Sequence, residues 1–272
     1  MCEIKLCTEL EWPDLKQSLQ VALKENPENI SNVLSFESLI KTRDIKDPLD
    51  EGIPPARIAL SFDKKWRVGK KLKISFINVS PEIKLKIINK ASEWLNYVNV
   101  KFVYIDDNDS SADIRITNEL GDGSWSYIGT DALLINSKKA TMNFGWLTES
   151  SSDEEYSRVV LHEFGHALGA IHEHQHPESA ISWNKEAVYA YYERTNNWDK
   201  DQVEKNIFKK YARGQTQYSS YDKKSIMHYA IPRQLVIDEK DVVGWNTELS
   251  PLDKSSMRKF YPLSKADGIE VG

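Results

Sequence analysis

The chain has 272 residues, of which 40% are hydrophobic and 28% are charged, and its net charge is −5. This composition is typical of a folded globular protein, and an aromatic share of 10% argues against a disordered chain. No apolar stretch approaches the roughly 20 residues that span a bilayer, and no long basic run offers a surface for nucleic acid. We therefore expect neither a membrane nor a nucleic acid as partner.

The amino-terminal segment carries few targeting signals. It has no apolar region of the kind found in cleavable signal peptides, which leaves two locations open: the cytoplasm, or export by a route that reads no such leader. The only two cysteines of the chain, Cys2 and Cys7, lie in this segment, so disulfides cannot stabilise the rest. Whether the two thiols are free stays open, although a bridge between them would close a very short loop and stabilise little.

Residues 1–55 are predicted to form an N-terminal extension. A helix is expected over Pro13–Glu25 and a second one near Ile30–Lys41, and the pair Pro54-Pro55 marks a linker. A single domain of residues 56–262 is expected to follow, with residues 263–272 as a tail.

Within the domain, the pattern predicts an α+β fold. Alternating apolar and polar residues indicate three strands, and a helix is expected to begin at Pro81 and to run to about Tyr97. The expected strands are Leu72–Val79, Val100–Ile105 and Ala112–Thr117. The segment Gly121–Gly129 is predicted to be a turn-rich loop, and two apolar runs, Ala132–Ile135 and Thr141–Leu147, follow it.

A long helix is expected to begin at Ser152 and to continue through Leu168, because Ser152 and Glu155 have the spacing of a capping box ahead of an apolar run. Two further helices are predicted, over Lys185–Tyr192 and Pro251–Phe260. We therefore expect a mixed, twisted sheet and one central helix in the first half of the domain, and a mostly helical or irregular second half.

The end of this long helix carries a pattern typical of a metal site, His162-Glu163-Phe164-Gly165-His166. Residues four apart on a helix lie about 40° apart and one turn on, so His162 and His166 project side by side and can reach one zinc ion. Glu163 lies beside them, where a general base can reach a water on the metal. The pattern therefore predicts both a metal site and a base.

His172 can supply a third ligand only if the helix ends before it. A continuing helix would direct His172 about 240° away from His166, facing away from the metal. Gly169 can adopt a left-handed conformation at a helix C-terminus, so the chain can turn there and bring His172 back. The spacing thus predicts that His162, His166 and His172 hold one catalytic zinc ion.

Three further segments accompany the histidine pattern. They are Gly123–Gly129 (GSWSYIG), His172–Pro177 (HEHQHP) and Ser225–Tyr229 (SIMHY). Together with the histidines they resemble the metzincin zinc peptidases, and SIMHY is similar to the Met-turn of the astacin branch. GSWSYIG is similar to the astacin segment G-C-W-S-Y-x-G, with Ser124 where astacins have cysteine. The resemblance covers about residues 56–262 and is closest to a bacterial and fungal group with H-E-H-Q-x-P after the third histidine.

This resemblance implies a metzincin-type fold and a zinc-dependent endopeptidase. Such an enzyme hydrolyses peptide bonds in proteins through a zinc-activated water, with Glu163 as general base. Met227 would form an apolar floor beneath the metal. Tyr229 would be a catalytic residue, a retractable fifth ligand that stabilises the oxyanion, and the alternative is a plain core tyrosine. Protein or peptide substrates and a monomeric enzyme are expected.

The sequence departs from astacins in two respects. The domain lacks the cysteines of the two family disulfides, and the residues after His172 differ from the family pattern H-E-x-x-R-x-D, so Glu173 is not assigned the family role of binding an N-terminal amine. His174, His176 and His228 are expected to be surface or packing residues, and the alternative is a role in substrate binding. An extended substrate is expected to pair with an edge strand, either Thr141–Leu147 or Ala132–Ile135.

Cys7 suggests that the extension is propeptide-like and that the chain is a zymogen. A thiolate is a strong zinc ligand, so Cys7 is a candidate latent-state ligand; the alternative is a surface thiol without a role. A rival function for the whole chain is a catalytically silent zinc module that binds a partner. Such a module would have no need of Glu163, whose presence favours hydrolysis.

Overall fold

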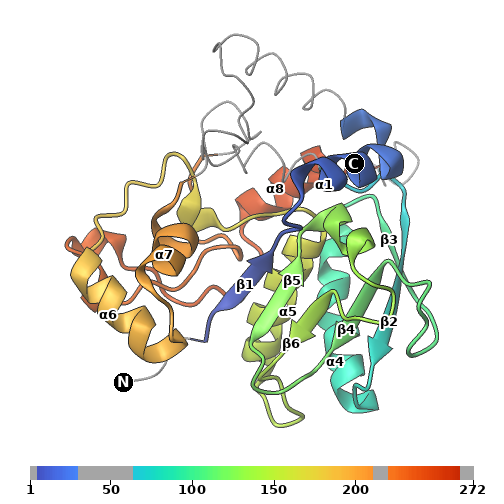
Figure 1. Cartoon of the computed structure of the whole chain (residues 1–272), viewed down its shortest axis with the longest axis horizontal. Coiled ribbons are helices and arrows are strands. Elements are labelled where there is room, and N and C mark those ends of the chain that lie inside the picture. The colour runs from blue at the N-terminus through green and yellow to red at the C-terminus, as the bar shows by residue number, and fades with distance from the viewer. Residues whose placement is uncertain (1–4, 30–63, 211–219, 264–272) are drawn as a thin grey trace, which may run out of the picture.

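The first half of the protein is built on one six-stranded mixed sheet (Figure 1). The computed structural model describes residues 5–29, 64–210 and 220–263. The strand order is β1-β5-β6-β4-β2-β3; β5 and β6 are antiparallel, and the other neighbours are parallel. The strands are β1 Cys7–Leu10, β2 Lys71–Ile77, β3 Lys101–Tyr104, β4 Ile114–Thr117, β5 Ser124–Tyr127 and β6 Met142–Phe144.

The predicted α+β class and the mixed sheet are confirmed, but the region around Gly121–Gly129 differs from the prediction. It contains strand β5, because Gly123 and Gly129, with φ of 71° and 47°, bound the strand instead of interrupting it. The run Ala132–Ile135 contributes to a 3-10 helix, not to a strand. Strand β6, inside the run Thr141–Leu147, lies between β5 and β4. Both predictions of a free substrate-binding edge were therefore wrong.

The helices occur close to where the sequence predicts them, except for the short helix α7, which was not predicted. They are α1 Leu15–Glu25, α4 Pro81–Ala91, α5 Asp153–Ala167, α6 Lys185–Asn196, α7 Lys200–Val203 and α8 Pro251–Phe260. The helix that begins at Pro81 is α-helical only to Ala91 and continues as a 3-10 segment over Ser92–Asn96. No helix of the described ranges is both long and apolar enough to cross a membrane. The predictions near Ile30–Lys41 and at Pro54-Pro55 lie outside the described residues.

Helix α5 begins at the predicted cap, although only half of the capping box forms. The Ser152 hydroxyl accepts a hydrogen bond from the Glu155 backbone N–H at 3.2 Å. The Glu155 carboxylate does not return to Ser152, because it accepts hydrogen bonds from Arg158 and from the Trp146 indole. The cap therefore fixes the start of α5 while Glu155 ties the helix to neighbouring segments.

The other end of α5 is held by aromatic side chains from three distant segments. The last carbonyls of a helix lack partners within the helix, and a buried helix must find them elsewhere. Trp66 Nε1 donates to the Ala167 carbonyl (2.8 Å) and Tyr261 Oη to the Leu168 carbonyl (2.8 Å), both at the helix end. Trp94 Nε1 donates to the Leu161 carbonyl (3.0 Å), which lies further back in the helix. Helix α5 is buried from Tyr156 to Ala167, and these bonds fix the position of its C-terminal part.

Strand β1 runs between the two halves of the molecule (Figure 1). Each half has a hydrophobic core of its own. The larger core joins the sheet with α4 and α5 and includes Cys7. The second core lies in the C-terminal half, around Tyr192 and Tyr229, and includes Leu6. Since adjacent residues of the extension belong to different cores, the extension contacts both halves of the molecule.

A buried ionic cluster also ties the extension to the domain. Lys64 Nζ lies 2.8 Å from Asp131 Oδ2 and 3.2 Å from Glu11 Oε1, and the side chains of Lys64 and Asp131 are only 3% and 0% exposed. Asp131 also accepts hydrogen bonds from the Trp12 backbone N–H and from the Ser18 hydroxyl. The carboxylate of Asp131 thus pairs with Lys64 and also accepts hydrogen bonds from two residues of the extension.

We predict that Asp131→Ala lowers the free energy of unfolding by about 3–5 kcal/mol, because it leaves a buried lysine charge and two extension donors without their main partner. The matched control is Asp107→Asn, which removes an exposed pair with Lys84 and should cost less than about 1 kcal/mol. Urea denaturation of both variants measures the difference. Equal, small losses would contradict the role given to Asp131.

Candidate active site

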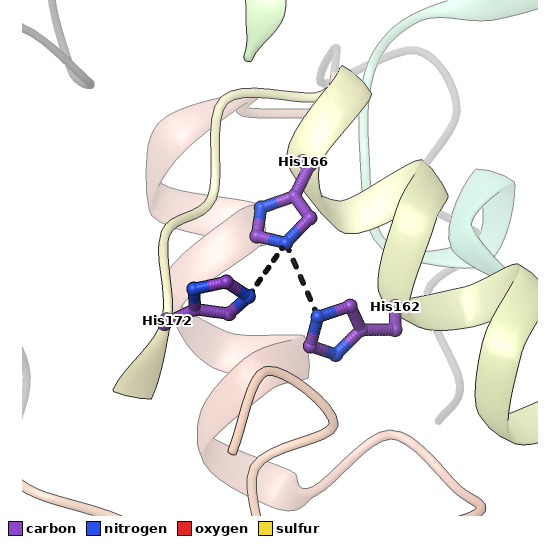
Figure 2. A group of neighbouring side chains, drawn as sticks. All are labelled: His162, His166 and His172. Carbon is purple, nitrogen blue, oxygen red and sulfur yellow. Dashed lines mark hydrogen bonds between the residues drawn. The ribbon is translucent and has the colours of Figure 1, made fainter. Parts of the chain in front are cut away.

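Three imidazoles meet at one point next to the end of α5 (Figure 2). His162 and His166 project from α5, and His172 follows after the chain has left the helix. The Nε2 atom of His166 lies 3.1 Å from Nε2 of His162 and 3.1 Å from Nε2 of His172. Within the described ranges, this is the one group of three or more histidine, cysteine or acidic side chains that could hold a metal.

The turn that returns His172 occurs at Gly169, as predicted. Gly169 has φ of 101°, a left-handed conformation that residues with a Cβ rarely adopt. The backbone N–H groups of Gly169 and Ala170 donate to the His166 and Gly165 carbonyls at 2.8 and 2.9 Å, which closes the end of the helix. The prediction of a glycine-terminated helix is therefore confirmed.

Contacts on the far side of each ring set its orientation. Nδ1 of His162 lies 2.7 Å from the Ile226 carbonyl, and Nδ1 of His166 lies 2.9 Å from the Ala170 carbonyl. A carbonyl can only accept, so in both rings Nδ1 carries the hydrogen and the lone pair is on Nε2. The Nε2 lone pairs thus face the common point.

The environment keeps these rings neutral, as metal ligands must be. Burial lowers the pKa of His166 to about 4. Burial and the neighbouring His166 hold the pKa of both His162 and His172 well below the usual histidine value. Neutral Nε2 atoms in a tetrahedral zinc site would be roughly 3.3 Å apart, so the donor type and spacing of these three rings fit zinc.

Glu163 lies next to the histidines with a carboxylate that is fully buried. Neither of its oxygens accepts a well-formed hydrogen bond from the described residues, although the Cys7 thiol, a weak donor, lies beside it. Burial raises the pKa of Glu163 well above its ordinary range. A buried carboxylate with spare acceptor capacity is suited to receive a proton.

The segment Ser225–Tyr229 passes directly under the histidines. The Ser225 hydroxyl and the Ile226 backbone N–H both donate to the Asp253 carboxylate, at 2.7 and 2.8 Å. Met227 packs so closely on α5 that a Cβ at Gly165 would collide with its Sδ atom. Met227 is therefore where the resemblance places it, and Gly165 is the residue that makes room for it.

Tyr229 is buried close to His172, with ring centroids 4.3 Å apart. Its phenol donates a hydrogen bond to the backbone carbonyl of Cys7 in the extension. Burial, with Glu9 adding to it, raises the pKa of Tyr229 well above the usual value, so the phenol remains a neutral donor. Tyr229 thus lies beside the histidines and already binds a peptide carbonyl.

The remaining histidines support Tyr229 by packing. His174 stacks on the Tyr229 ring at 4.4 Å between centroids, and its Nε2 lies 2.9 Å from the Asn206 carbonyl. His228 contacts the Tyr229 carbonyl through Nδ1 and the Tyr221 hydroxyl through Nε2. These two, and His176, are buried. Of the two expectations for them, surface or packing, the structure supports packing.

Two residues of the extension reach the site. Side chains two apart on a strand point to the same face, and on β1 these are Cys7 and Glu9. The Cys7 thiol lies beside the Glu163 carboxylate. Oε2 of Glu9 lies 3.4 Å from Nδ1 of His172. No sequence pattern indicates Glu9, because only the pairing of β1 with the distant strand β5 brings its side chain to the histidines. Asp253 was also missed, although its spacing from Ser250 fits a cap.

A small pocket extends from His162 to the residues around the start of β1. Its lining comprises Lys5, Leu6, Cys7, Arg158, His162, Ile226, His228, Tyr229, Trp245 and Asn246. The Arg158 guanidinium lies 4.1 Å from the centre of the Trp245 ring and is paired with Glu155. The pocket therefore combines apolar walls with a neutralised ion pair next to the histidines.

Comparison with known proteins agrees with this geometry. The sequence profile of the peptidase family described as Astacin matches residues 61–262. A solved structure of myroilysin is 45% identical, with a TM-score of 0.71, and the match covers 76% of this chain and 98% of that chain. A second myroilysin structure is 46% identical, with a TM-score of 0.58 and coverages of 74% and 86%. No curated protein matches the sequence.

The family match spans most of the chain, and the metzincin-type fold, the His-Glu helix, the glycine turn and the methionine turn all lie within it. The predicted fold and the predicted zinc peptidase class are confirmed. The protein belongs to the astacin family of peptidases and is a metalloendopeptidase that uses one catalytic zinc ion.

Proposed function

We propose that His162, His166 and His172 hold the zinc ion of this endopeptidase and that Glu163 is its general base. The observation that carries the proposal is the convergence of three Nε2 atoms. Nε2 of His166 lies 3.1 Å from Nε2 of His162 and 3.1 Å from Nε2 of His172. The buried carboxylate of Glu163, adjacent in sequence to His162, supports the second part. A silent zinc module would have no use for such a carboxylate.

Zinc held by the three histidines would polarise the scissile carbonyl and lower the pKa of a water. Glu163 would accept a proton from the attacking water and donate it to the nitrogen of the leaving amine. Because its oxygens are not engaged by strong donors, Glu163 can accept the proton without breaking a fixed hydrogen bond. Burial of the site also strengthens the electrostatic interactions within it.

Tyr229 is proposed to stabilise the oxyanion that forms at the attacked carbonyl. The support is that its phenol donates to the Cys7 carbonyl, a peptide oxygen that lies beside the histidines. A substrate carbonyl at this place would meet the same donor, and a preorganised donor is worth most when charge develops on the oxygen. The alternative, a tyrosine that only packs, would leave the phenol without a role in catalysis.

We propose that substrates bind as extended peptides along β5. The edge of β5 that does not face β6 accepts an extended segment, since β1 pairs there over four residues. Main-chain pairing of this kind binds peptides with little dependence on sequence. β1 occupies the edge where a substrate would pair, so the extension must leave before a substrate can bind.

This arrangement supports the proposal that residues 1–55 are an inhibitory propeptide, ahead of a catalytic domain of residues 56–262 and a tail of residues 263–272. Cys7 would supply a latent-state ligand to zinc, since its buried side chain lies beside Glu163, next to the histidines. The mature enzyme would act as a monomer on protein or peptide substrates, with neither membrane nor nucleic acid as partner.

We predict that Glu163→Gln lowers kcat/KM for casein by about 10³-fold while zinc stays bound, because the amide cannot accept the proton. Casein hydrolysis and metal content are measured on the same activated preparation, with a chelator-treated sample as the metal-free reference. Full activity of Glu163→Gln would show that another group is the base.

We predict that Tyr229→Phe lowers kcat by about 10²-fold with little change in KM, because one donor to the oxyanion is lost. Tyr189→Phe is the matched control: its phenol binds Glu204 in the C-terminal half and should not affect turnover. Steady-state kinetics on a peptide substrate decide the question. Equal kinetics for both variants would reduce Tyr229 to a packing residue.

For Cys7→Ser, the expected result is several-fold higher activity of the full-length chain, because a hydroxyl is a far weaker zinc ligand than a thiolate. Peptide hydrolysis by the uncleaved protein is the measurement, with sizes checked by mass spectrometry to exclude self-processing. Cys2→Ser serves as the control and should match the wild type. If Cys7→Ser also matches the wild type, the thiol has no role in latency.

A further inference from the structure

Glu9 of strand β1 contacts the histidine cluster from behind. Its Oε2 atom lies 3.4 Å from Nδ1 of His172 and 3.8 Å from Nδ1 of His166, and it accepts a hydrogen bond from the His172 backbone N–H at 3.3 Å. The Glu9 side chain is only 18% exposed. One carboxylate of the extension therefore reaches the rings on the side opposite their Nε2 atoms.

The three rings differ in what holds Nδ1. For His162 and His166 it is a backbone carbonyl of the domain itself, from Ile226 and Ala170. Nδ1 of His172 instead faces the carboxylate of Glu9, which belongs to the extension, in an ion-pair contact of 3.4 Å. His172 also lies on an irregular segment after the glycine turn, whereas the other two are fixed by helix α5. Of the three rings, the orientation of His172 depends most on a partner outside the domain.

A carboxylate at Nδ1 of a metal-binding histidine fixes the ring and its tautomer and makes Nε2 a stronger donor. Loss of such a partner typically costs 10–100-fold in metal affinity. We propose that Glu9 is a positioning residue for His172, so that the extension that blocks the cleft also helps the domain to acquire and retain zinc. This inference rests on the proposed ligation by the three histidines.

The placement of β1 accounts both for the blocked cleft and for the contact of Glu9 with His172. Thr8 lies between Cys7 and Glu9, so both side chains leave the same face of the strand. The pairing of Glu9 with Ser126 of β5 sets its height along the sheet, and the bond from Tyr229 to the Cys7 carbonyl secures the strand next to His172. A strand that only blocked the cleft would not need a carboxylate directed at a ligand histidine.

The test is the zinc affinity of the full-length chain, measured by competition with a chromophoric chelator. Glu9→Gln keeps the shape of the side chain but removes its charge, and we expect it to weaken zinc binding by about 10–100-fold. Glu11→Gln is the matched control, because Glu11 also belongs to the extension but pairs with Lys64. It should bind zinc like the wild type. Glu9→Asp, which restores the charge, should recover part of the loss.

Cobalt(II) spectra distinguish an effect of Glu9 on the His172 ring from an effect on the binding of strand β1 to the domain. If Glu9 acts on His172, the visible absorption bands of the cobalt-loaded protein shift in Glu9→Gln but not in Glu11→Gln. The effect should persist when Cys7 is changed to Ser in both proteins, because it acts through His172. Wild-type affinity in Glu9→Gln, an unshifted spectrum, or an effect that vanishes with Cys7 would each overturn the inference. Absence of stoichiometric zinc from the wild type would instead overturn the proposed ligation.

Discussion

The convergence of three imidazoles is the constraint on which the rest of the structure depends. Two of them follow from the repeat of helix α5, but the third requires the chain to reverse within a few residues, and the left-handed turn at Gly169 makes this reversal. Backbone carbonyls then fix two of the rings so that Nε2 faces the common point. Burial lowers the pKa of His166 to about 4 and so keeps this ring neutral, as a metal ligand must be.

Much of the surrounding structure serves to hold this turn in place. Indole and phenol groups from three separate segments bind backbone carbonyls in the C-terminal part of α5 and at its C-cap. From the other side, Asp253 binds the backbone and side chain of the segment that carries Met227, and Gly165 lets that methionine approach the helix. These contacts hold the histidines from two sides, while the edge of β5 that does not face β6 is covered by β1.

The sequence predicts this site well where the chemistry is local. His162, Glu163, His166 and the glycine turn lie within a few residues of each other, so helix geometry alone relates them. Pairings between distant segments could not be predicted. Strand β5 was not predicted, because the glycines at both ends of the segment indicated a loop. The contact of Glu9 with His172 exists only because β1 pairs with β5. For the same reason the free edge of the sheet was assigned to the wrong segments.

The extension thus has two relations to the site: it occupies the edge of β5 where we propose that substrates pair, and it places Cys7 beside Glu163 and Glu9 beside His172. The roles proposed for Cys7 and Glu9 presuppose a metal held by the three histidines. The most direct measurement is a crystallographic anomalous difference map recorded at the zinc edge. The account predicts one peak per chain, about 2.0–2.1 Å from Nε2 of His162, His166 and His172. A peak at other residues, or a His172 ring directed away from the peak, would contradict it.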